Sequence, residues 1–231
     1  MVRRLKIVGI VQCRMSSSRL PAKAMLDLSG KTILERVLHR ANKSNFLEEI
    51  WVATSTDKLD DIVEFQAKKE HYNVFRGNLD NVLCRFCKCI EKCNADIIVR
   101  ITADNPFTEV KFIDLSIAHI LNTGCDYVTF KNVPYGSGVE SFTREAIFRA
   151  NKSAISKEEK EHVTLHILNN MDKFNCTKMN PPWDDLKRPD IRATIDTIED
   201  YYNIKSFYNN EKSDSDSLED YIKFIDMRKR T

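Results

Sequence analysis

Short apolar runs separated by longer amphipathic stretches recur along the first 130 residues. Each run is followed by polar residues or by glycine and proline, a pattern typical of strands buried in a parallel sheet. The stretches between them have helical spacing. The predicted strands are Ile7–Gln12, Ile50–Thr54, Ile97–Ile101 and Tyr127–Phe130, and the predicted helices are Thr32–Ala41, Asp60–Lys69, Asn81–Cys93 and Phe112–Leu121. Strands that alternate with helices of this length predict an α/β fold with a mainly parallel sheet flanked by helices.

The second half of the chain has a less regular pattern. We expect helices over Ser156–Asn170, Ile198–Phe207 and Leu218–Arg228, strand and loop over Thr177–Arg188, and a late strand over Ile191–Ile195. Residues 209–217 are polar and predict a mobile linker before the C-terminal helix. We interpret residues 1–231 as one domain that contains an irregular region over residues 131–190.

Composition and charge exclude several classes of protein. Hydrophobic residues make up 42% of the 231 residues and charged residues 30%, which is too apolar for a disordered chain. The formal net charge of +2 argues against a nucleic-acid partner, which needs a clear basic surplus. No stretch approaches the 18 apolar residues of a membrane span. The basic N-terminus precedes an apolar run, Ile7–Val11, that is too short for a secretory signal, so we expect a cytoplasmic protein.

Three apparent metal motifs do not meet the requirements of a metal site. Four of the seven cysteines, Cys84, Cys87, Cys89 and Cys93, fall on one predicted helix and point in different directions, so they are better read as small buried residues. His162 and His166 are four residues apart but lack the glutamate of a zinc-protease helix. The Asp214-Ser215-Asp216 triplet lies in the polar linker, far from any strand end.

The most informative segment follows the first strand. Residues 12–23 read Gln-Cys-Arg-Met-Ser-Ser-Ser-Arg-Leu-Pro-Ala-Lys, with three cations and three consecutive hydroxyls just beyond a strand end. Arginine side chains fork onto phosphates, lysine adds a point charge, and backbone N–H groups of small residues cradle phosphate oxygens. The segment is neither a P-loop nor a dinucleotide fingerprint, because it lacks their glycines. The alternative is a solvated basic loop.

The same segment resembles the signature of the cytidylyltransferases that activate acidic sugars, in particular the branch of spore coat polysaccharide biosynthesis protein F and the 3-deoxy-manno-octulosonate cytidylyltransferases. Other motifs agree in the same order along nearly the whole chain: Asp27–Lys31, Arg76-Gly77 with Val82-Leu83 and Arg85, Val99–Pro106, Glu161–Thr164 and Ala193–Asp200. The chain departs from the family pattern at Cys13, Ser16 and Ala22, where the family has Ala, Gly and Gly. The side chain at position 16 restricts the backbone near a phosphate.

The resemblance implies a Rossmann-like fold of the nucleotide-diphospho-sugar transferase type. It also implies transfer of CMP from CTP to an acidic sugar or related small acceptor, with release of pyrophosphate, in surface-polysaccharide biosynthesis. The loop residues are expected to contact the phosphates of the nucleotide, and Thr54 and Arg100 are expected to face its base and ribose. The full set is Gln12, Arg14, Met15, Ser16, Ser17, Ser18, Arg19, Lys23, Thr54 and Arg100. Candidates on the acceptor side are Glu140, His162 and Arg192. The alternative for Glu140 is a surface carboxylate without a function, and the alternative for His162 is a histidine on the surface of a helix. A homodimer is also implied.

Asp104 and Asp196 each follow a predicted strand, 92 residues apart. The ends of parallel strands meet at one edge of a sheet, so the two carboxylates are expected to converge there and bind Mg²⁺. We expect Arg14, Lys23, Asp104 and Asp196 to be catalytic. The alternative is that Asp104 caps a turn before Pro106 and that Asp196 caps the next helix.

Two other functions remain open from the sequence. One is a nucleotidyltransferase that uses another nucleoside triphosphate, or a glycosyltransferase of the same fold. The other is a catalytically silent relative that binds a nucleotide, although such a protein has no reason to retain Lys23 and both aspartates.

Overall fold

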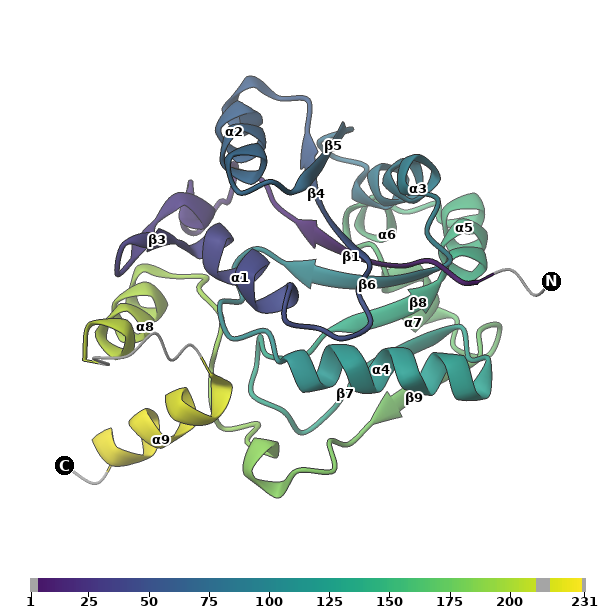
Figure 1. Cartoon of the computed structure of the whole chain (residues 1–231). Coiled ribbons are helices and arrows are strands. Elements are labelled where there is room, and N and C mark those ends of the chain that lie inside the picture. The colour runs from purple at the N-terminus through teal and green to yellow at the C-terminus, as the bar shows by residue number, and fades with distance from the viewer. Residues whose placement is uncertain (1–3, 211–216, 230–231) are drawn as a thin grey trace.

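A seven-stranded, mostly parallel sheet with helices on both faces forms the centre of the protein, in a computed structural model that describes residues 4–210 and 217–229 (Figure 1). The strand order is β5-β4-β1-β6-β8-β7-β9, and a two-residue hairpin, β2 with β3, lies beside it. The strands are β1 (Ile7–Gln12), β2 (Asp27–Leu28), β3 (Lys31–Thr32), β4 (Glu49–Ser55), β5 (Asn73–Gly77), β6 (Ile97–Thr102), β7 (Tyr127–Phe130), β8 (Glu140–Thr143) and β9 (Cys176–Met179). The predicted α/β architecture is therefore confirmed.

Parallel pairing aligns the ends of the strands that carry the candidate site. β1 lies between β4 and β6, with Gln12 opposite Ala53 on one side and Thr102 on the other. The segments that follow β1 and β6 therefore leave the sheet side by side. The loop before Lys23 and the loop that carries Asp104 start at the same edge, as the order of the strands predicts.

One strand in the sheet is antiparallel. β8 pairs with β6 and β7 in the opposite direction, and Arg100 lies opposite Glu140. The sequence analysis did not anticipate β8 or β5. Both are short strands, and β8 begins with a glutamate, so neither shows the apolar run of a buried parallel strand.

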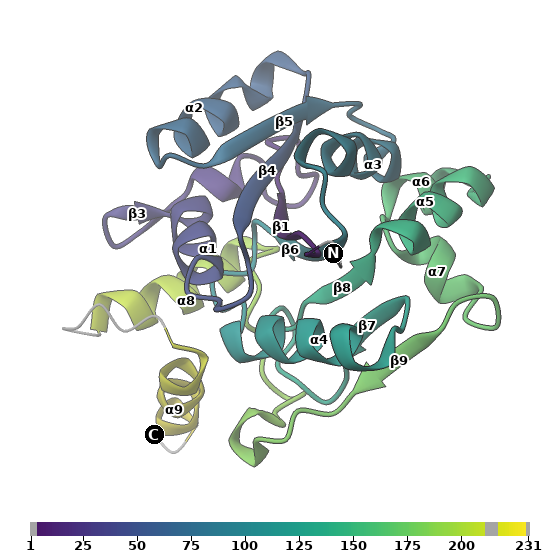
Figure 2. The ribbon, with the colours of Figure 1, turned by 45° about the vertical axis from the view of Figure 1, so that its right-hand side comes forward.

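Helices cover the two faces of the sheet, and the sheet separates two apolar cores. Alternate residues of β1 enter different cores, Ile7 and Val11 on one face and Val8 and Ile10 on the other. In Figure 2, α5, α6 and α7 lie together beside β8, and α8 and α9 lie at the opposite end. The helices are α1 (Ile33–Ala41), α2 (Asp61–Lys69), α3 (Val82–Cys93), α4 (Val110–Thr123), α5 (Arg144–Ser153), α6 (Lys157–Glu161), α7 (Leu165–Asn169), α8 (Ile198–Asn210) and α9 (Leu218–Arg228).

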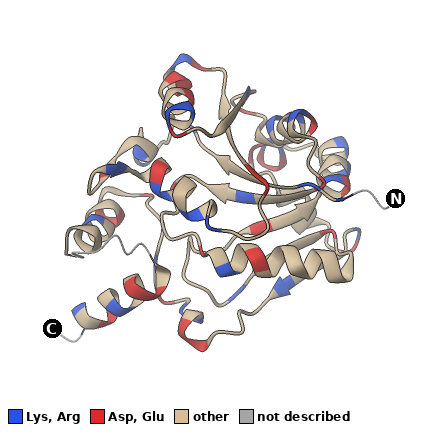
Figure 3. Ribbon diagram, in the orientation of Figure 1, with Lys and Arg blue, Asp and Glu red and all other residues tan. Residues whose placement is uncertain are grey.

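Several local predictions are confirmed in detail. The capping box at the start of α1 is present: the Thr32 hydroxyl accepts the Glu35 N–H, and the Glu35 carboxylate accepts the Thr32 N–H. Cys87, Cys89 and Cys93 of α3 are buried and Cys84 is half-buried, which agrees with small residues on or beside an apolar face. Blue and red positions are interspersed along outer helices such as α2 (Figure 3).

Two local predictions are wrong. Ile191–Ile195 is not a strand, because its partner is the loop before β8: Tyr135 and Arg192 form an isolated bridge, and Gly136 packs against Thr194. Gly136 has φ +94°, and a Cβ there would lie 2.7 Å from Thr194 Cβ. The single helix over Ser156–Asn170 is instead α6 and α7, since the chain leaves the helical conformation at His162.

The region over residues 131–190, expected to be irregular, contains β8, β9 and α5–α7. Asn209 and Asn210 end α8, and Ser217 caps α9. The rest of the predicted linker and its Asp-Ser-Asp triplet lie outside the described residues. In the part of the chain described, no helix combines the length and apolar character needed to cross a bilayer.

Candidate active site

Lys23 joins the two aspartates that the sequence analysis selected. Its ammonium donates to Asp104 Oδ2 at 2.5 Å, Asp196 Oδ1 at 2.9 Å and the Ile195 carbonyl at 2.9 Å. The Lys23 side chain is 12% exposed, so these bonds form in a protected setting. Because both Asp104 Oδ2 and Asp196 Oδ1 accept from the same ammonium nitrogen, the two carboxylates lie close together. The prediction that Asp104 and Asp196 converge at one edge is thus confirmed in its geometry.

The chain that carries Asp196 reaches this edge without being a strand. The Ile195 N–H donates to the Asp104 carbonyl at 2.9 Å, and this bond holds the two segments together. Beyond Asp196, the Thr197 hydroxyl accepts the Asp200 N–H at the start of α8. Thr197 therefore serves as the cap of that helix, and the Asp196 carboxylate is directed to the cations instead.

Three cations surround the Asp196 carboxylate. Besides Lys23, Arg19 Nη2 lies 2.9 Å from Oδ1 and Arg192 Nη2 lies 2.8 Å from Oδ2. Burial alone would raise the pKa of Asp196, but Lys23 and the two arginines outweigh it and hold this pKa below its usual value. Asp196 is therefore ionised at neutral pH and enclosed by positive charge.

The donor set at this position fits a magnesium ion. Magnesium is usually bound by one or two carboxylates together with substrate phosphates and water, rather than by a cage of protein ligands. Asp104 and Asp196 present two carboxylates around one cationic group, the Lys23 ammonium. An ion there would take its other ligands from outside the protein.

The loop between β1 and Lys23 is folded around Met15. The Met15 carbonyl accepts the N–H groups of Ser17 and Ala22, both at 2.9 Å, and the Met15 N–H donates to Asp60 Oδ1 at 2.7 Å. Met15 and Ser17, which the sequence analysis placed on the phosphates, thus use their backbone N–H groups inside the protein. The N–H groups of Ser16 and Ser18 have no acceptor among the described residues.

Ala22, which stands where the related family has glycine, adopts a left-handed conformation with φ +59°. This region favours glycine, because the Cβ of other residues crowds the following carbonyl at a cost of about 1–2 kcal/mol. The loop therefore has the backbone conformation that a glycine would adopt freely, and Ala22 adopts it at the cost of local strain.

Two adjoining cavities lie over this edge. The smaller has a volume of about 220 Å³ and is lined by Arg14, Ser17, Ser18, Lys23 and Asp104, among others. The larger, about 690 Å³, extends over the loop that precedes β8. Gln12, Arg19, Thr102, Asp104 and Asp196 line both. Together they provide a polar recess that opens into a wider cleft.

Glu140 lies at the base of the wider cleft with every carboxylate oxygen engaged. Arg100, the Tyr127 hydroxyl and the Thr164 hydroxyl all donate to it, and Arg100 also donates to Gln12. Burial opposes ionisation of Glu140, but Arg100 and the hydroxyl donors hold its pKa below the usual value. The surface carboxylate considered as the alternative is therefore excluded.

Of the remaining residues predicted for the site, some line the cavities and others do not. His162 is exposed and lines the wider cleft, because the chain turns there between α6 and α7. Arg14 forms an ion pair of 3.2 Å with Glu161 at the same turn. Thr54 is fully buried in β4 and lines neither cavity.

Sequence reasoning missed two buried charges below the loop. Asp60 is 1% exposed and accepts hydrogen bonds from Met15 and Ser55. Arg85 is fully buried, and its Nε and Nη2 have no acceptor in the described part of the chain. Burial lowers the pKa of Arg85 to about 10, so it remains charged at neutral pH. Arg85 belonged to a motif already noted, whereas nothing in the spacing of Asp60 distinguished it from a helix cap.

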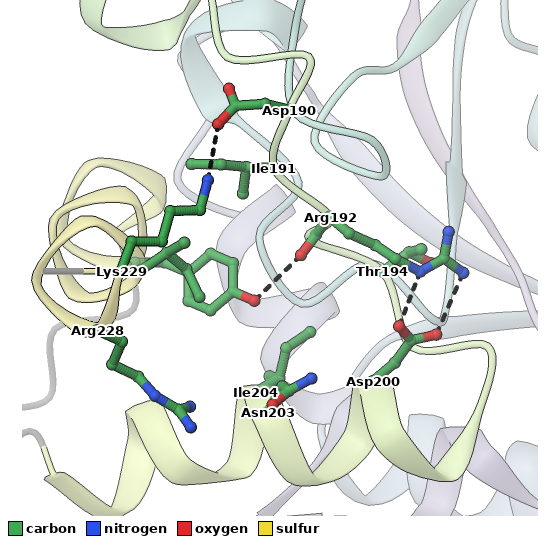
Figure 4. A pocket seen from close by; sticks show the side chains of 11 residues that line it. Asp190, Ile191, Arg192, Thr194, Asp200, Asn203, Ile204, Arg228 and Lys229 are labelled. Carbon is green, nitrogen blue, oxygen red and sulfur yellow. Dashed lines mark hydrogen bonds and ion pairs between the residues drawn. The ribbon is translucent and has the colours of Figure 1, made fainter. Parts of the chain in front are cut away.

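Arg192 also faces a third cavity of about 280 Å³ between α8 and α9 (Figure 4). Its guanidinium is paired with both Asp196 and Asp200, and the Tyr221 hydroxyl donates to its carbonyl oxygen at 3.1 Å. Arg192 therefore lies in the wall between the site and this outer cavity, where its side chain is held by carboxylates rather than being directed into the wider cleft.

Known proteins are similar to this chain in sequence and in fold. Residues 8–228 match the family described as "Cytidylyltransferase". The chain is 35% identical over 207 residues to spore coat polysaccharide biosynthesis protein SpsF of Bacillus subtilis, covering 87% of this chain and 86% of that protein. A solved cytidylyltransferase from Leptospira borgpetersenii superposes with a TM-score of 0.87 at 31% identity, over 98% of this chain and 95% of the other. The fold is also that of CMP:2-keto-3-deoxy-manno-octonic acid synthetase, solved with CTP, with a TM-score of 0.69 at 16% identity over 88% of this chain and 98% of the other.

Proposed function

Because the chain belongs to the cytidylyltransferase family, we propose that it transfers CMP from CTP to an acidic sugar or a related small acceptor and releases pyrophosphate. The observation that carries this proposal is the Lys23 ammonium between Asp104 and Asp196, beside a loop rich in cations and hydroxyls. In the reaction, an oxygen of the acceptor attacks the α-phosphorus of CTP. The bond from that phosphorus to the bridging oxygen of pyrophosphate breaks.

The loop provides groups suited to a triphosphate. Arg14, Arg19 and Lys23 offer positive charge, and Ser16 and Ser18 offer backbone N–H groups that no protein acceptor uses among the described residues. Negative charge accumulates on pyrophosphate as it leaves, and fixed cations stabilise that charge most effectively in a protected recess. The hydroxyls of Ser16, Ser17 and Ser18 add further donors. Arg14 leaves its pair with Glu161 to take part.

A magnesium ion bound by Asp104 and Asp196 would polarise the α-phosphate. The chain supplies the rest of the charge balance. Lys23 holds the two carboxylates close together before the nucleotide binds, and it exchanges them for phosphate oxygens when the nucleotide arrives. Arg192 keeps its own bond to Asp196 Oδ2 and so orients that carboxylate.

We propose that Gln12 and Arg100 face the nucleoside, whereas Thr54, which is fully buried and lines neither cavity, supports that wall from within β4. Gln12 lines both cavities, and its amide oxygen is already fixed by Arg100 Nε at 3.2 Å.

The wider cleft suits the acceptor. The volume of this cleft, about 690 Å³, is ample for a sugar acid. His162 and Glu140 are among the residues that line it. We propose that His162 donates to the acceptor, that Glu140 acts by fixing Arg100, and that Arg192 acts through Asp196. We further propose a cytoplasmic homodimer that serves surface-polysaccharide synthesis.

The experiment is transfer itself. The protein is incubated with CTP, Mg²⁺ and a panel of octulosonic and nonulosonic acids, and with phosphorylated sugars, while pyrophosphate release is measured. Release that requires CTP and one class of acid supports the proposal. Equal release with ATP, or binding of nucleotides without release for any acceptor, contradicts it and favours another nucleotidyltransferase or a silent relative, respectively.

A further inference from the structure

A buried carboxylate outside the predicted site touches the loop that we assign to the triphosphate. Asp60 ends a short 3₁₀ helix, Lys58–Asp60, that begins shortly after β4, and the residue is 1% exposed. One carboxylate oxygen, Oδ1, accepts the Met15 N–H at 2.7 Å. The other, Oδ2, accepts the N–H of Ser55 at 3.0 Å together with the Ser55 hydroxyl. Asp60 thus ties the loop after β1 to the end of the neighbouring strand.

The contact falls on Met15, the residue around which the loop closes. The Met15 carbonyl accepts the N–H groups of Ser17 and Ala22, so both ends of the serine-containing turn are attached to it. The Met15 N–H, on the other side of the same residue, is held by Asp60. Fixing Met15 therefore fixes the direction in which Arg14, Ser18 and Arg19 leave the backbone.

The electrostatic setting keeps Asp60 charged. Burial works against ionisation, but the hydrogen bonds from Ser55 and Met15 hold the pKa of Asp60 below its usual value. The guanidinium of Arg85, fully buried, lies near enough for the Asp60 charge to favour its protonation. A carboxylate that is buried, charged and bonded on both oxygens is a rigid anchor.

We propose that Asp60 is a positioning residue for the triphosphate: through the Met15 N–H it holds the phosphate loop in the conformation that binds CTP. This inference rests on the proposed function, since it takes the loop to bind the phosphates of CTP. Asp60 touches no substrate. It acts on the β- and γ-phosphates through the loop and leaves the nucleoside contacts unaffected.

The test compares Asp60→Asn with Ser55→Ala. Asparagine keeps the size of the side chain but loses the charge and turns an amide N–H₂ toward one of the present donors. Ser55→Ala removes a donor from the other oxygen of the same carboxylate and leaves the Met15 contact in place. The affinities for CTP and for CMP are measured by calorimetry for both variants and the wild type, with Mg²⁺ present.

We expect Asp60→Asn to weaken CTP binding by about tenfold or more and CMP binding by less than about twofold. In Ser55→Ala, the ratio of the CTP affinity to the CMP affinity should stay close to that of the wild type. An unchanged CTP affinity in Asp60→Asn overturns the proposal. So does an equal loss for CTP and CMP, or the same change of ratio in Ser55→Ala, because either result means that Asp60 only stabilises the fold.

A wild type that binds CTP no more tightly than CMP contradicts the proposed function itself, and the inference fails with it. If Asp60→Asn does not fold, amide hydrogen exchange in the nucleotide-free wild type replaces it. Protection of the Met15 N–H supports the anchor, and exchange at the rate of an exposed loop amide overturns it.

Discussion

Replacing Lys23 with methionine tests the charge arrangement at the centre of the site. Methionine keeps a side chain of similar length but removes the ammonium that contacts Asp104, Asp196 and the Ile195 carbonyl. Breaking a buried ion pair by removal of one partner costs about 3–5 kcal/mol, because the other partner is left uncompensated. Asp196 keeps Arg19 and Arg192, and Asp104 is 24% exposed, so we expect the lower end, about 3 kcal/mol.

The loss depends on pH in a defined direction. In the wild type the pKa of Asp196 is held below its usual value, and Lys23 is the largest favourable cause. A carboxylate with a lowered folded-state pKa adds its stability in full above the unfolded pKa of about 3.9 and loses it as the pH falls through the folded value. The difference between wild type and Lys23→Met is therefore complete at pH 7 and narrows below about pH 4.

Urea melts at pH 7, 5 and 3.5 measure this difference, and thermal melts at pH 7 should fall by about 6–12 °C for a chain of this size. Arg19→Met is the matched control, since Arg19 pairs with the same carboxylate but is 63% exposed and should cost less than about 1 kcal/mol. If Lys23→Met loses no more stability than Arg19→Met at pH 7, or if its deficit is as large at pH 3.5 as at pH 7, the reasoning is refuted.

Three further outcomes are expected. CTP with Mg²⁺ at about 100 times its dissociation constant should add about 2.7 kcal/mol of stability, more than UTP, ATP or GTP at equal concentration in a thermal-shift assay; equal shifts for CTP and ATP would exclude cytidine selectivity. Asp104→Asn and Asp196→Asn should each lower turnover by about 100-fold or more across a Mg²⁺ titration, and near-normal activity of both at low Mg²⁺ would refute a metal role for the pair. Ala22→Gly should stabilise the protein by up to about 1 kcal/mol in urea melts, since it relieves the left-handed strain at φ +59° while adding freedom to the unfolded chain; a destabilised variant would contradict that conformation.

The parts of the fold that sequence predicts are those with local causes. The four apolar runs, the capping box at Thr32 and the convergence of Asp104 with Lys23 all follow from sequence patterns and from the geometry of parallel strands. By contrast, the short strand β8 becomes a strand only because β6 and β7 accept it on both sides. Such tertiary pairing leaves no apolar run to read.

Two mistaken interpretations have the same origin. Residues 191–195 are apolar at alternate positions, yet they pack on a loop whose closeness depends on Gly136. The helical spacing over Ser156–Asn170 continues through His162, but the chain turns there so that Thr164 donates to Glu140. In both places a long-range contact at the wider cleft overrides a local preference, as is expected near functional sites.

Asp60 shows why the loop could not be understood from its own residues. From sequence, Met15 belonged to the loop expected to bind phosphates, whereas in the folded protein its N–H group donates to a carboxylate 45 residues away. The spacing of Asp60 at the start of a helix predicts a cap, which is the commonest use of aspartate at such positions. Only the tertiary structure distinguishes the anchor from the cap.

The order in which the chain is synthesised gives the Lys23 contact a further consequence. Lys23 leaves the ribosome 173 residues ahead of Asp196, an interval of roughly 10–35 seconds at about 5–20 residues per second. During that interval β1, β4, β5 and β6 can already pair, with the basic loop lacking one of its two carboxylate partners. Asp196 arrives with α8, whose Phe207 and Tyr208 pack on Phe107 just beyond the Asp104 loop. Docking of α8 therefore adds aromatic side chains to the apolar core and supplies the second carboxylate, so that a nascent chain has both carboxylates beside Lys23 only after residue 196 has emerged.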